Sequence, residues 1–339
     1  MKKVILESHV PYTGDVLGRV AEVVVLPPEE ITQSTVSDAD ALIVRTRTRC
    51  DEALLGHSKV SFVGTATIGT DHFDLPWLAA HGIEAVNAPG CNAPAVAQYV
   101  LASILTYIPD PKGLTVGVVG VGHVGSIVDD WCRSLGMNTL LCDPPRAAAE
   151  GSEKFTSMQE IAEKADIITF HTPYYRPGHP YATHHLADDA FFELLKRKPM
   201  VINAARGSVV DNEALLRAMD AGQVSRTVID CWEGEPRINL TLLHRVDIAT
   251  PHIAGYSVEG KKRAAQTVVN ALMRHFGCDL RLDNNVAAGA VANPHPEAIS
   301  SSYDPLTDTA AMRRAFAADP SAATFERLRN TYPLRAEVQ

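Results

Sequence analysis

The sequence predicts an α/β protein with two doubly wound parallel-sheet domains and a short C-terminal region. Three observations support this prediction. The chain has 339 residues, enough for two or three domains of roughly 100–200 residues each. Short apolar runs alternate with helix-like segments, most regularly from about residue 115 to residue 250. After residue 277 the chain becomes rich in Ala, Asn, Pro and Ser and loses this periodicity.

The first sheet is predicted from three apolar runs, at residues 4–6, 41–44 and 60–63. Helix-like segments separate these runs, which favours parallel strands. The second run leads into the charged stretch 45–49, which contains three arginines, and the third leads into the Gly- and Thr-rich stretch 64–71.

The second sheet begins after a long apolar helix predicted over residues 93–107. Asn92 is a suitable N-cap for this helix, and Pro109 and Pro111 end it. A β-branched strand at 115–119, a glycine loop, a helix closed by Gly136 and a strand at 139–142 follow. Later strands are predicted at 165–170, 200–203, 227–229 and 247–249, with helical segments such as 211–221 between them.

The composition favours an ordinary soluble globular protein, with 46% hydrophobic and 21% charged residues. The formal charge of -9 gives no attraction to nucleic acids or anionic lipids, so we expect neither as a partner. No apolar run approaches the ~20 residues of a membrane span, and the N-terminus has no signal-peptide core, so we expect a cytoplasmic location. The six cysteines are scattered and no H-E-x-x-H pattern occurs, so we predict no metal site.

Residues 120–125 form a G-x-G-x-x-G loop between a predicted strand and a predicted helix. Gly120 permits a tight turn, Gly122 lets the backbone approach a pyrophosphate, and Gly125 lets the helix pack on the strand. Asp143 ends the next strand, where its carboxylate binds ribose hydroxyls and repels a 2′-phosphate. The loop therefore favours NAD over NADP, although Arg146 offers a cation that a 2′-phosphate would bind.

Three later segments follow predicted strands, so each lies at the carboxyl end of the sheet, where such folds bind ligands. They are residues 202–207 (INAARG), 230–236 (DCWEGEP) and 251–255 (PHIAG). Together with the glycine loop they resemble the D-2-hydroxyacid dehydrogenase family. The resemblance implies that Arg206 holds the substrate carboxylate and carbonyl oxygen, and that Glu235 pairs with His252, the general acid/base.

These residue types suit the reaction. Oxidation removes a hydride from C2 and a proton from the 2-hydroxyl, and a histidine has an ordinary pKa of roughly 6.5, near working pH. An adjacent carboxylate fixes the ring and raises that pKa. A planar guanidinium holds a carboxylate through two bonds. The same resemblance implies NAD contacts at Gly120, Gly122, His123, Val124, Gly125, Asp143, Thr172, Asp230 and Gly255.

Further stretches, at 64–72, 88–93, 142–146, 168–173 and 253–261, resemble the erythronate-4-phosphate dehydrogenases within that family. This resemblance implies oxidation of 4-phospho-D-erythronate to 2-oxo-3-hydroxy-4-phosphobutanoate, a step of pyridoxal 5′-phosphate biosynthesis. It places substrate contacts on Thr46, Thr67 and Tyr256, and Arg45 is our predicted phosphate contact. For Arg47 and Arg49, exposure to solvent is at least as good an explanation as a phosphate contact.

The resemblance also implies a domain organisation. Residues 1–92 with 257–280 would form a flavodoxin-like substrate-binding domain, and residues 93–256 a Rossmann NAD-binding domain. Residues 281–339 would form an α+β region through which the protein dimerises. The family's region continues beyond a segment like 325–330, so we expect its last strands and helix to be missing here.

Two alternatives remain open. The same fold would serve another D-2-hydroxy acid, such as 3-phosphoglycerate. A protein of another class, an NAD sensor without catalysis, would keep the fold and lose the reaction, but it would not need Arg206, Glu235 and His252. We interpret His184 and His185 as surface or helix-start histidines.

Overall fold

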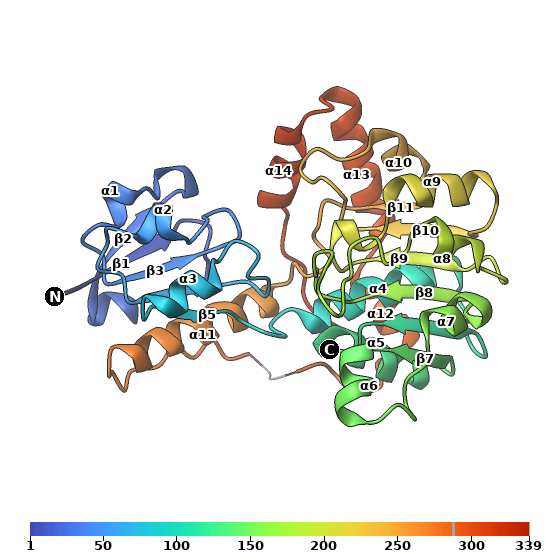
Figure 1. The fold of residues 1–339 in the computed structure, drawn as a ribbon, viewed down its shortest axis with the longest axis horizontal. Helices are drawn as coiled ribbons and strands as arrows, with labels where there is room; N and C mark the ends of the chain where they lie inside the picture. The colour runs from blue at the N-terminus through green and yellow to red at the C-terminus, as the bar shows by residue number, and fades with distance from the viewer. Residues whose placement is uncertain (287–288, 339) are drawn as a thin grey trace. The chain divides into compact units, whose positions relative to one another are not determined.

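The computed structural model describes residues 1–286 and 289–338. The chain divides into two compact units, one formed by Met1–Asn92 with Ser257–Ala288 and the other by Ala93–Tyr256 with Gly289–Gln339. Each unit contains one parallel sheet, which confirms the predicted fold class of two parallel-sheet α/β domains (Figure 1). In the described part of the chain no helix is both long and apolar enough to cross a membrane.

The first unit has a five-stranded parallel sheet in the order β2-β1-β3-β4-β5, the flavodoxin-like order. Its strands are β1 (Lys2–Glu7), β2 (Ala21–Leu26), β3 (Ala41–Val44), β4 (Phe62–Thr65) and β5 (Glu84–Val86). Strands β1, β3 and β4 match the three predicted runs. Strands β2 and β5 were not predicted; they are the two edges of the sheet, and their half-exposed residues give a weaker apolar signal.

Helices cover this first sheet. They are α1 (Gln33–Val36), α2 (Glu52–Leu55), α3 (Leu75–Ala80) and α11 (Val258–His275), with short 3₁₀ turns η1 (Leu17–Arg19) and η2 (Pro28–Glu30). Helix α11 packs closely on β4, because a Cβ added at Gly64 would lie 2.3 Å from Val268 Cγ1. The glycine therefore lets the helix approach the strand, and the buried face of α11 joins the core.

The second unit has a six-stranded parallel sheet in the order β11-β10-β9-β8-β6-β7. Its strands are β6 (Thr115–Val119), β7 (Asn138–Cys142), β8 (Ile167–Phe170), β9 (Met200–Asn203), β10 (Arg226–Ile229) and β11 (Ile248–Ala249). The strand order reverses between β6 and β8, and ligands of such sheets bind at the carboxyl ends beside this reversal. Strand β8 begins at Ile167, later than the predicted start at residue 165, because Ala165 caps the preceding helix.

Two layers of helices cover the second sheet. They are α4 (Ala93–Tyr107), α5 (His123–Ser134), α6 (Pro144–Glu150), α7 (Met158–Lys164), α8 (Asp189–Glu193), α9 (Asn212–Asp220) and α10 (Leu240–Arg245), with the 3₁₀ turn η3 (Gly207–Val209). Helix α4 is buried from Ala93 to Leu105, which explains why its sequence is apolar on every side. Asp143, Ser157, Asp188, Asp211 and Asn239 cap the helices that follow them.

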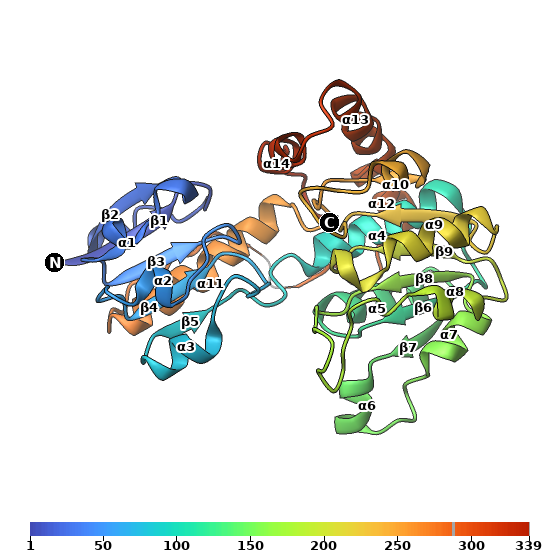
Figure 2. The ribbon, with the colours of Figure 1, turned by 45° about the horizontal axis from the view of Figure 1, so that its top comes forward.

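The C-terminal residues belong to the second unit and contain α12 (Pro296–Ser302), α13 (Pro305–Ala318) and α14 (Ala322–Asn330). Figures 1 and 2 show α13 beside α10 and β11, at one edge of the sheet. The buried side chain of Gln98 on α4 donates hydrogen bonds to Ser302 Oγ (2.8 Å) and to the carbonyl of Ala336 (3.2 Å). Helices are the only regular elements in the described part of residues 289–338, so the expected α+β character is not found there.

Candidate active site

The predicted site residues of the second unit lie on the loops that follow its strands. Parallel strands end at one edge of a sheet, so these loops share the carboxyl edge. In chain order the loops carry Gly120 after β6, Asp143 after β7, Thr172 after β8, Arg206 after β9, Asp230 and Glu235 after β10, and His252 after β11.

The glycine loop joins β6 to α5. Gly120 has a φ of +88°, a conformation that favours glycine, and a Cβ there would lie 2.7 Å from the backbone N of Thr172. A Cβ on Gly125 would lie 2.0 Å from the carbonyl oxygen of Gly120, so α5 packs directly on the loop. Gly122 precedes the helix, with nothing within 4 Å of where its Cβ would be. His123 and Val124 begin α5, and the N–H groups of a helix start are suited to bind a pyrophosphate. The open space at Gly122 lies beside these groups.

Asp143 connects the end of β7 to this glycine loop. Its Oδ2 accepts the backbone N–H of Val121 at 2.8 Å, and its Oδ1 accepts that of Arg146 at 3.0 Å. The Arg146 guanidinium donates two hydrogen bonds to the Glu150 carboxylate, at 2.7 and 2.8 Å, and one to the Val121 carbonyl at 2.6 Å. The cation that would attract a 2′-phosphate is therefore already neutralised, which favours NAD.

Two half-buried residues after β8 lie with their backbone against the glycine loop. Burial lowers the pKa of His171 to about 3, so its ring is neutral, and its Nε2 lies 2.9 Å from Thr169 Oγ1. The hydroxyl of Thr172 is buried and finds no hydrogen-bond partner within the described ranges. Buried hydroxyls normally have a partner, so a bound group that supplies one beside Gly120 fits here. These residues therefore fit NAD.

The Arg206 loop is fixed by the buried side chain of Asn203, which ends β9. Its Nδ2 donates hydrogen bonds to the carbonyls of Arg206 (3.0 Å) and Cys231 (3.3 Å), so one amide joins the loops after β9 and β10. A Cβ on Gly207 would lie 2.0 Å from the carbonyl oxygen of Trp232, so these two loops are in direct contact. Arg206 thereby lies beside the segment that ends in Glu235.

Glu235 and His252 form a close pair. Nδ1 of His252 lies 2.5 Å from Oε1 of Glu235, and both side chains are about one quarter exposed. Oε2 of Glu235 accepts the backbone N–H of Trp232 at 3.2 Å. Burial alone would raise the pKa of Glu235, but the charge and hydrogen bond of His252 prevail and lower it to about 2. The carboxylate is therefore ionised and leaves Nε2 of His252 for a substrate.

Asp230 holds the loop that carries His252. Its fully buried carboxylate accepts the backbone N–H groups of Ile253 (2.7 Å) and Ala254 (3.1 Å) and the Thr250 hydroxyl (2.7 Å). The Tyr99 hydroxyl lies 2.8 Å from that of Thr250, which continues the network into α4. In this structure the carboxylate thus positions the histidine loop, whereas its nicotinamide contact remains a prediction. Gly255 lies in the same loop.

His184 and His185, interpreted as surface or helix-start residues, belong to a cluster with Glu233. Both are half-buried in a turn before α8, and their rings stack with centroids 4.0 Å apart. Nε2 of His185 lies 2.5 Å from Oε1 of Glu233, two residues before Glu235. His184, His185 and Glu233 each offer one ligand atom within 4.8 Å of the others, a spacing with which a metal ion is compatible. The nearly parallel rings, tilted by 19°, do not direct their nitrogens to one point.

Comparison with known proteins agrees with this geometry. Residues 101–254 match the family described as D-isomer specific 2-hydroxyacid dehydrogenase, NAD binding domain. An erythronate-4-phosphate dehydrogenase of Bacteroides thetaiotaomicron is 44% identical over 346 residues, which cover 99% of this chain and 97% of the relative. This chain belongs to the erythronate-4-phosphate dehydrogenase family. A member from Escherichia coli O157:H7 is 46% identical over 280 residues, 81% of this chain and 74% of that protein.

Solved structures agree with the family assignment. The D-lactate dehydrogenase of Aquifex aeolicus, complexed with NAD and lactic acid, is 25% identical with a TM-score of 0.68. The match covers 81% of this chain and 95% of that chain. The chain thus carries the NAD-binding domain of this dehydrogenase family, and NAD is its cofactor.

The residues that the family resemblance assigns to the substrate lie in both units. Tyr256 ends the histidine loop of the second unit and is buried. Arg45 and Thr46 follow β3 and are half-buried, and Thr67 follows β4, with its hydroxyl 2.7 Å from that of Thr65. Arg45, Thr46 and Thr67 thus lie at the carboxyl edge of the first sheet.

Glu7, a residue outside the predicted site, shapes the Arg45 loop. This buried residue ends β1, and its Oε2 accepts the backbone N–H of Arg45 at 2.7 Å and contacts the Thr48 hydroxyl at 3.5 Å. Arg47 and Arg49 are exposed, as their interpretation as solvent-facing residues implies, and Arg49 pairs with Asp51 at 2.6 Å. The only available sequence signal for Glu7 was a charged residue at the end of an apolar run.

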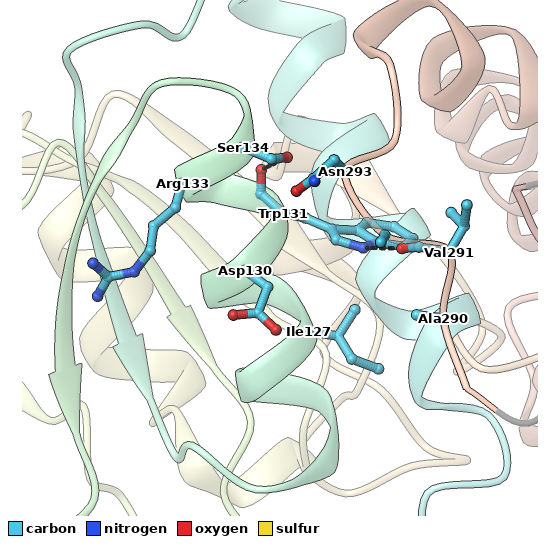
Figure 3. Close-up of a pocket in the computed structure, with 9 residues that line it drawn as sticks. Ile127, Asp130, Trp131, Arg133, Ser134, Ala290, Val291 and Asn293 are labelled. Atoms are coloured by element: carbon cyan, nitrogen blue, oxygen red, sulfur yellow. Dashed lines mark hydrogen bonds between the residues drawn. The ribbon is translucent and has the colours of Figure 1, made fainter.

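A pocket of about 610 Å³ lies away from these loops, between α5 and the segment 290–293 (Figure 3). The Trp131 indole crosses it and donates a hydrogen bond to the Val291 carbonyl at 2.9 Å. Asp130, Arg133 and Asn293 also line it. No predicted site residue is among the described residues that line this pocket.

Proposed function

We propose that this protein uses NAD to oxidise 4-phospho-D-erythronate to 2-oxo-3-hydroxy-4-phosphobutanoate in pyridoxal 5′-phosphate biosynthesis. The observation that carries the reaction type is the 2.5 Å contact between His252 and Glu235, on loops at the same sheet edge as Arg206 and the glycine loop. The substrate rests on the relatives named erythronate-4-phosphate dehydrogenase.

In this mechanism His252 takes the proton from the 2-hydroxyl group of the substrate on Nε2, while the C2–O bond becomes a carbonyl. NAD, when bound, would supply the acceptor for the hydride from C2. Glu235 stabilises the imidazolium that forms, because its lowered pKa keeps it ionised. Arg206 binds the carboxylate and stabilises the oxygen whose charge changes. Asp230 keeps the histidine loop in place.

The phosphorylated end of the substrate needs contacts from other residues. We assign these to Thr46, Thr67 and Tyr256, with Arg45 as the phosphate contact. The support is their type and position: Arg45, Thr46 and Thr67 follow strand ends, Tyr256 adds a third hydroxyl, and Glu7 fixes the Arg45 backbone. Hydroxyls and a guanidinium are suitable donors to phosphate oxygens.

The decisive test compares substrates. Steady-state oxidation with NAD should give a higher kcat/KM for erythronate 4-phosphate than for 3-phosphoglycerate, glycerate or lactate. About a hundredfold preference for 3-phosphoglycerate would contradict our choice and leave the reaction type intact. His252→Ala should abolish turnover while leaving NADH binding nearly unchanged, as a fluorescence titration would show. Turnover at one tenth of the wild-type rate would refute the acid/base assignment.

We further propose that the protein is a cytoplasmic homodimer and that residues 281–339 contribute to the contact between its two copies. The family resemblance supports this assignment. Light scattering on the eluted protein should give twice the mass of the chain. A single-chain mass at micromolar concentration would refute the dimer without affecting the proposed reaction.

A further inference from the structure

The last residues of the chain reach the loop that carries the acid/base histidine. Arg335 donates hydrogen bonds to the carbonyls of Ile253 (3.0 Å), Tyr256 (3.3 Å) and Ala254. It also donates one to the carbonyl of Ala95 (3.0 Å), at the start of α4. Residues 93–256 form the larger segment of the second unit. One guanidinium thus binds both the start and the end of this segment.

These bonds complement those of Asp230. Asp230 accepts N–H groups of residues 253 and 254, and Arg335 donates to carbonyls of the same segment, so the loop is held through both kinds of backbone group. His252 itself has a φ of +58°, which is unfavourable for a residue with a side chain. Such a conformation persists only where the surroundings hold it firmly. Arg335 and Asp230 are those surroundings.

A second C-terminal arginine lies at the same place. Arg329, near the end of α14, lies close enough to Tyr256 and Glu235 for its charge to interact with both. Its Nε is buried and has no hydrogen-bond partner among residues 1–286 and 289–338. The ring of Tyr332 meets that of Tyr256 edge-on, with centroids 6.2 Å apart. Arg335 and Tyr332 of the C-terminal segment therefore contact the residues that follow His252, and Arg329 adds a charge nearby.

We propose that Arg335 and Arg329 are positioning residues of the acid–base site, acting within the same chain. Arg335 fixes the backbone after His252, and Arg329 places a positive charge beside Tyr256 and Glu235. This role rests on the proposed proton transfer at His252 but not on the identity of the hydroxy acid. It gives the C-terminal residues a function in catalysis in addition to the proposed dimer contact.

The chemistry of arginine suits this role. A guanidinium presents five N–H donors in one plane and stays charged, so it serves several carbonyls at once. The Arg335 guanidinium also lies over the Tyr303 ring, 4.5 Å from its centroid, which restricts its plane. A lysine at this position would offer a point charge with three donors and would not reproduce this arrangement.

The test compares Arg335→Ala, Arg335→Lys and Arg329→Gln with Arg327→Ala. Arg327 is an exposed arginine on α14, the helix that also carries Arg329, and it serves as the matched control. A loop displaced by about 1 Å costs on the order of a hundredfold in rate. We expect kcat to fall at least tenfold in both Arg335 variants, with the dissociation constant of NADH within about twofold of wild type. Arg329→Gln should lower kcat less and also raise KM.

Two further measurements separate positioning from general stability. Guanidinium chloride at about 50 mM should restore part of the kcat of Arg335→Ala, and the same concentration of KCl should not. Hydrogen exchange of the peptide that spans residues 250–257 should accelerate in Arg335→Ala and not in Arg327→Ala. This second readout needs no substrate, so it tests the inference even if the wild-type protein does not oxidise erythronate 4-phosphate.

Three results would overturn the inference. They are a kcat of Arg335→Ala within twofold of wild type, unchanged exchange in residues 250–257, or equal losses of kcat and NADH affinity without rescue by guanidinium. A wild-type enzyme that prefers another hydroxy acid would refute only the proposed substrate. The variant-to-wild-type ratios would then be measured with that acid.

Discussion

The carboxylate of Asp230 accepts the backbone N–H of Ile253 at 2.7 Å, which fixes the residue directly after His252, the proposed acid/base. The same carboxylate accepts the Thr250 hydroxyl, and Thr250 in turn contacts Tyr99 on α4. Burial raises the pKa of Asp230, while the charge of His252 and these hydrogen bonds act in the opposite direction. The loop that carries His252 is thus held by a buried polar network that extends into the long apolar helix α4.

Replacing Asp230 by Asn should slow catalysis more than it weakens cofactor binding. The Asn amide keeps one acceptor but turns an NH₂ donor toward a backbone N–H, so at least one bond to residues 253 or 254 is lost. A hydrogen bond to a charged group contributes about 1.5–3 kcal/mol, which corresponds to roughly a 10- to 150-fold loss of kcat if the histidine is displaced. Stopped-flow measurement of the hydride-transfer rate would give the size of this loss. Thr250→Val, which removes only the neighbouring hydroxyl, should have a smaller effect, and a larger one would contradict this order.

Glu235→Gln should lower kcat by about a hundredfold, because the neutral amide cannot stabilise the imidazolium that forms on His252. The substitution should also change the response of stability to acid. The pKa of Glu235 is lowered to about 2, so its contribution is present above its ordinary pKa near 4.5 and is lost as pH falls from there toward 2. Urea unfolding at pH 7 and at pH 3.5 should show a smaller acid loss for Glu235→Gln than for wild type. Equal losses would mean that the pair does not stabilise the fold.

His171 should make the second unit lose stability at a higher pH than the pH range in which Glu235 acts. The pKa of His171 is lowered to about 3 by burial, so the unfolded chain binds a proton there that the folded chain does not. Stability from this group is complete above pH 6.5 and falls by up to about 1.4 kcal/mol per pH unit as pH decreases toward 3. His171→Gln keeps a partner for Thr169 and cannot ionise. Its unfolding free energy should therefore change less between pH 7 and pH 5 than that of wild type. A parallel decline in both proteins would refute the assignment.

How much of this site the sequence predicts depends on the distance between partners. The glycine loop and the segments around Arg206, Glu235 and His252 each follow an apolar run, and the rule for parallel sheets places them at one edge. Arg335 was not predicted because it lies about 80 residues from the loop it holds, in a segment of weak periodicity. Nothing in the local sequence pattern distinguishes Arg335, which donates a hydrogen bond to Ile253, from an exposed arginine.

Buried polar partners were missed for a related reason. Glu7 ends β1, and a charged residue at a strand end is normally interpreted as solvent-exposed, yet its carboxylate fixes the Arg45 backbone. His185 was interpreted as a surface residue because its partner Glu233 is 48 residues away. Edge strands β2 and β5 were missed because they are only half-buried. Local patterns predict the strands that end in site loops, whereas side-chain pairing across loops requires the fold.

The preference for NAD should depend on two carboxylates acting at different points. Asp143 repels a 2′-phosphate directly, and Glu150 holds the Arg146 guanidinium through two hydrogen bonds. Asp143→Ser removes the repulsion but keeps a side chain suitable to cap α6. We expect it to improve kcat/KM for NADP relative to NAD by about tenfold, since one close charge interaction contributes on the order of 1–2 kcal/mol in partly exposed surroundings. Glu150→Ala alone should change this ratio little, because Asp143 still repels the phosphate.

The double variant Asp143→Ser/Glu150→Ala tests the coupling between these residues. With Glu150 removed, Arg146 loses the carboxylate that neutralises it and becomes available to a 2′-phosphate next to residue 143. The improvement for NADP should therefore exceed the product of the two single effects, which a double-mutant cycle on kcat/KM would measure. Purely multiplicative effects would mean that Arg146 does not reach the phosphate, because its third bond, to the Val121 carbonyl, would keep it in place.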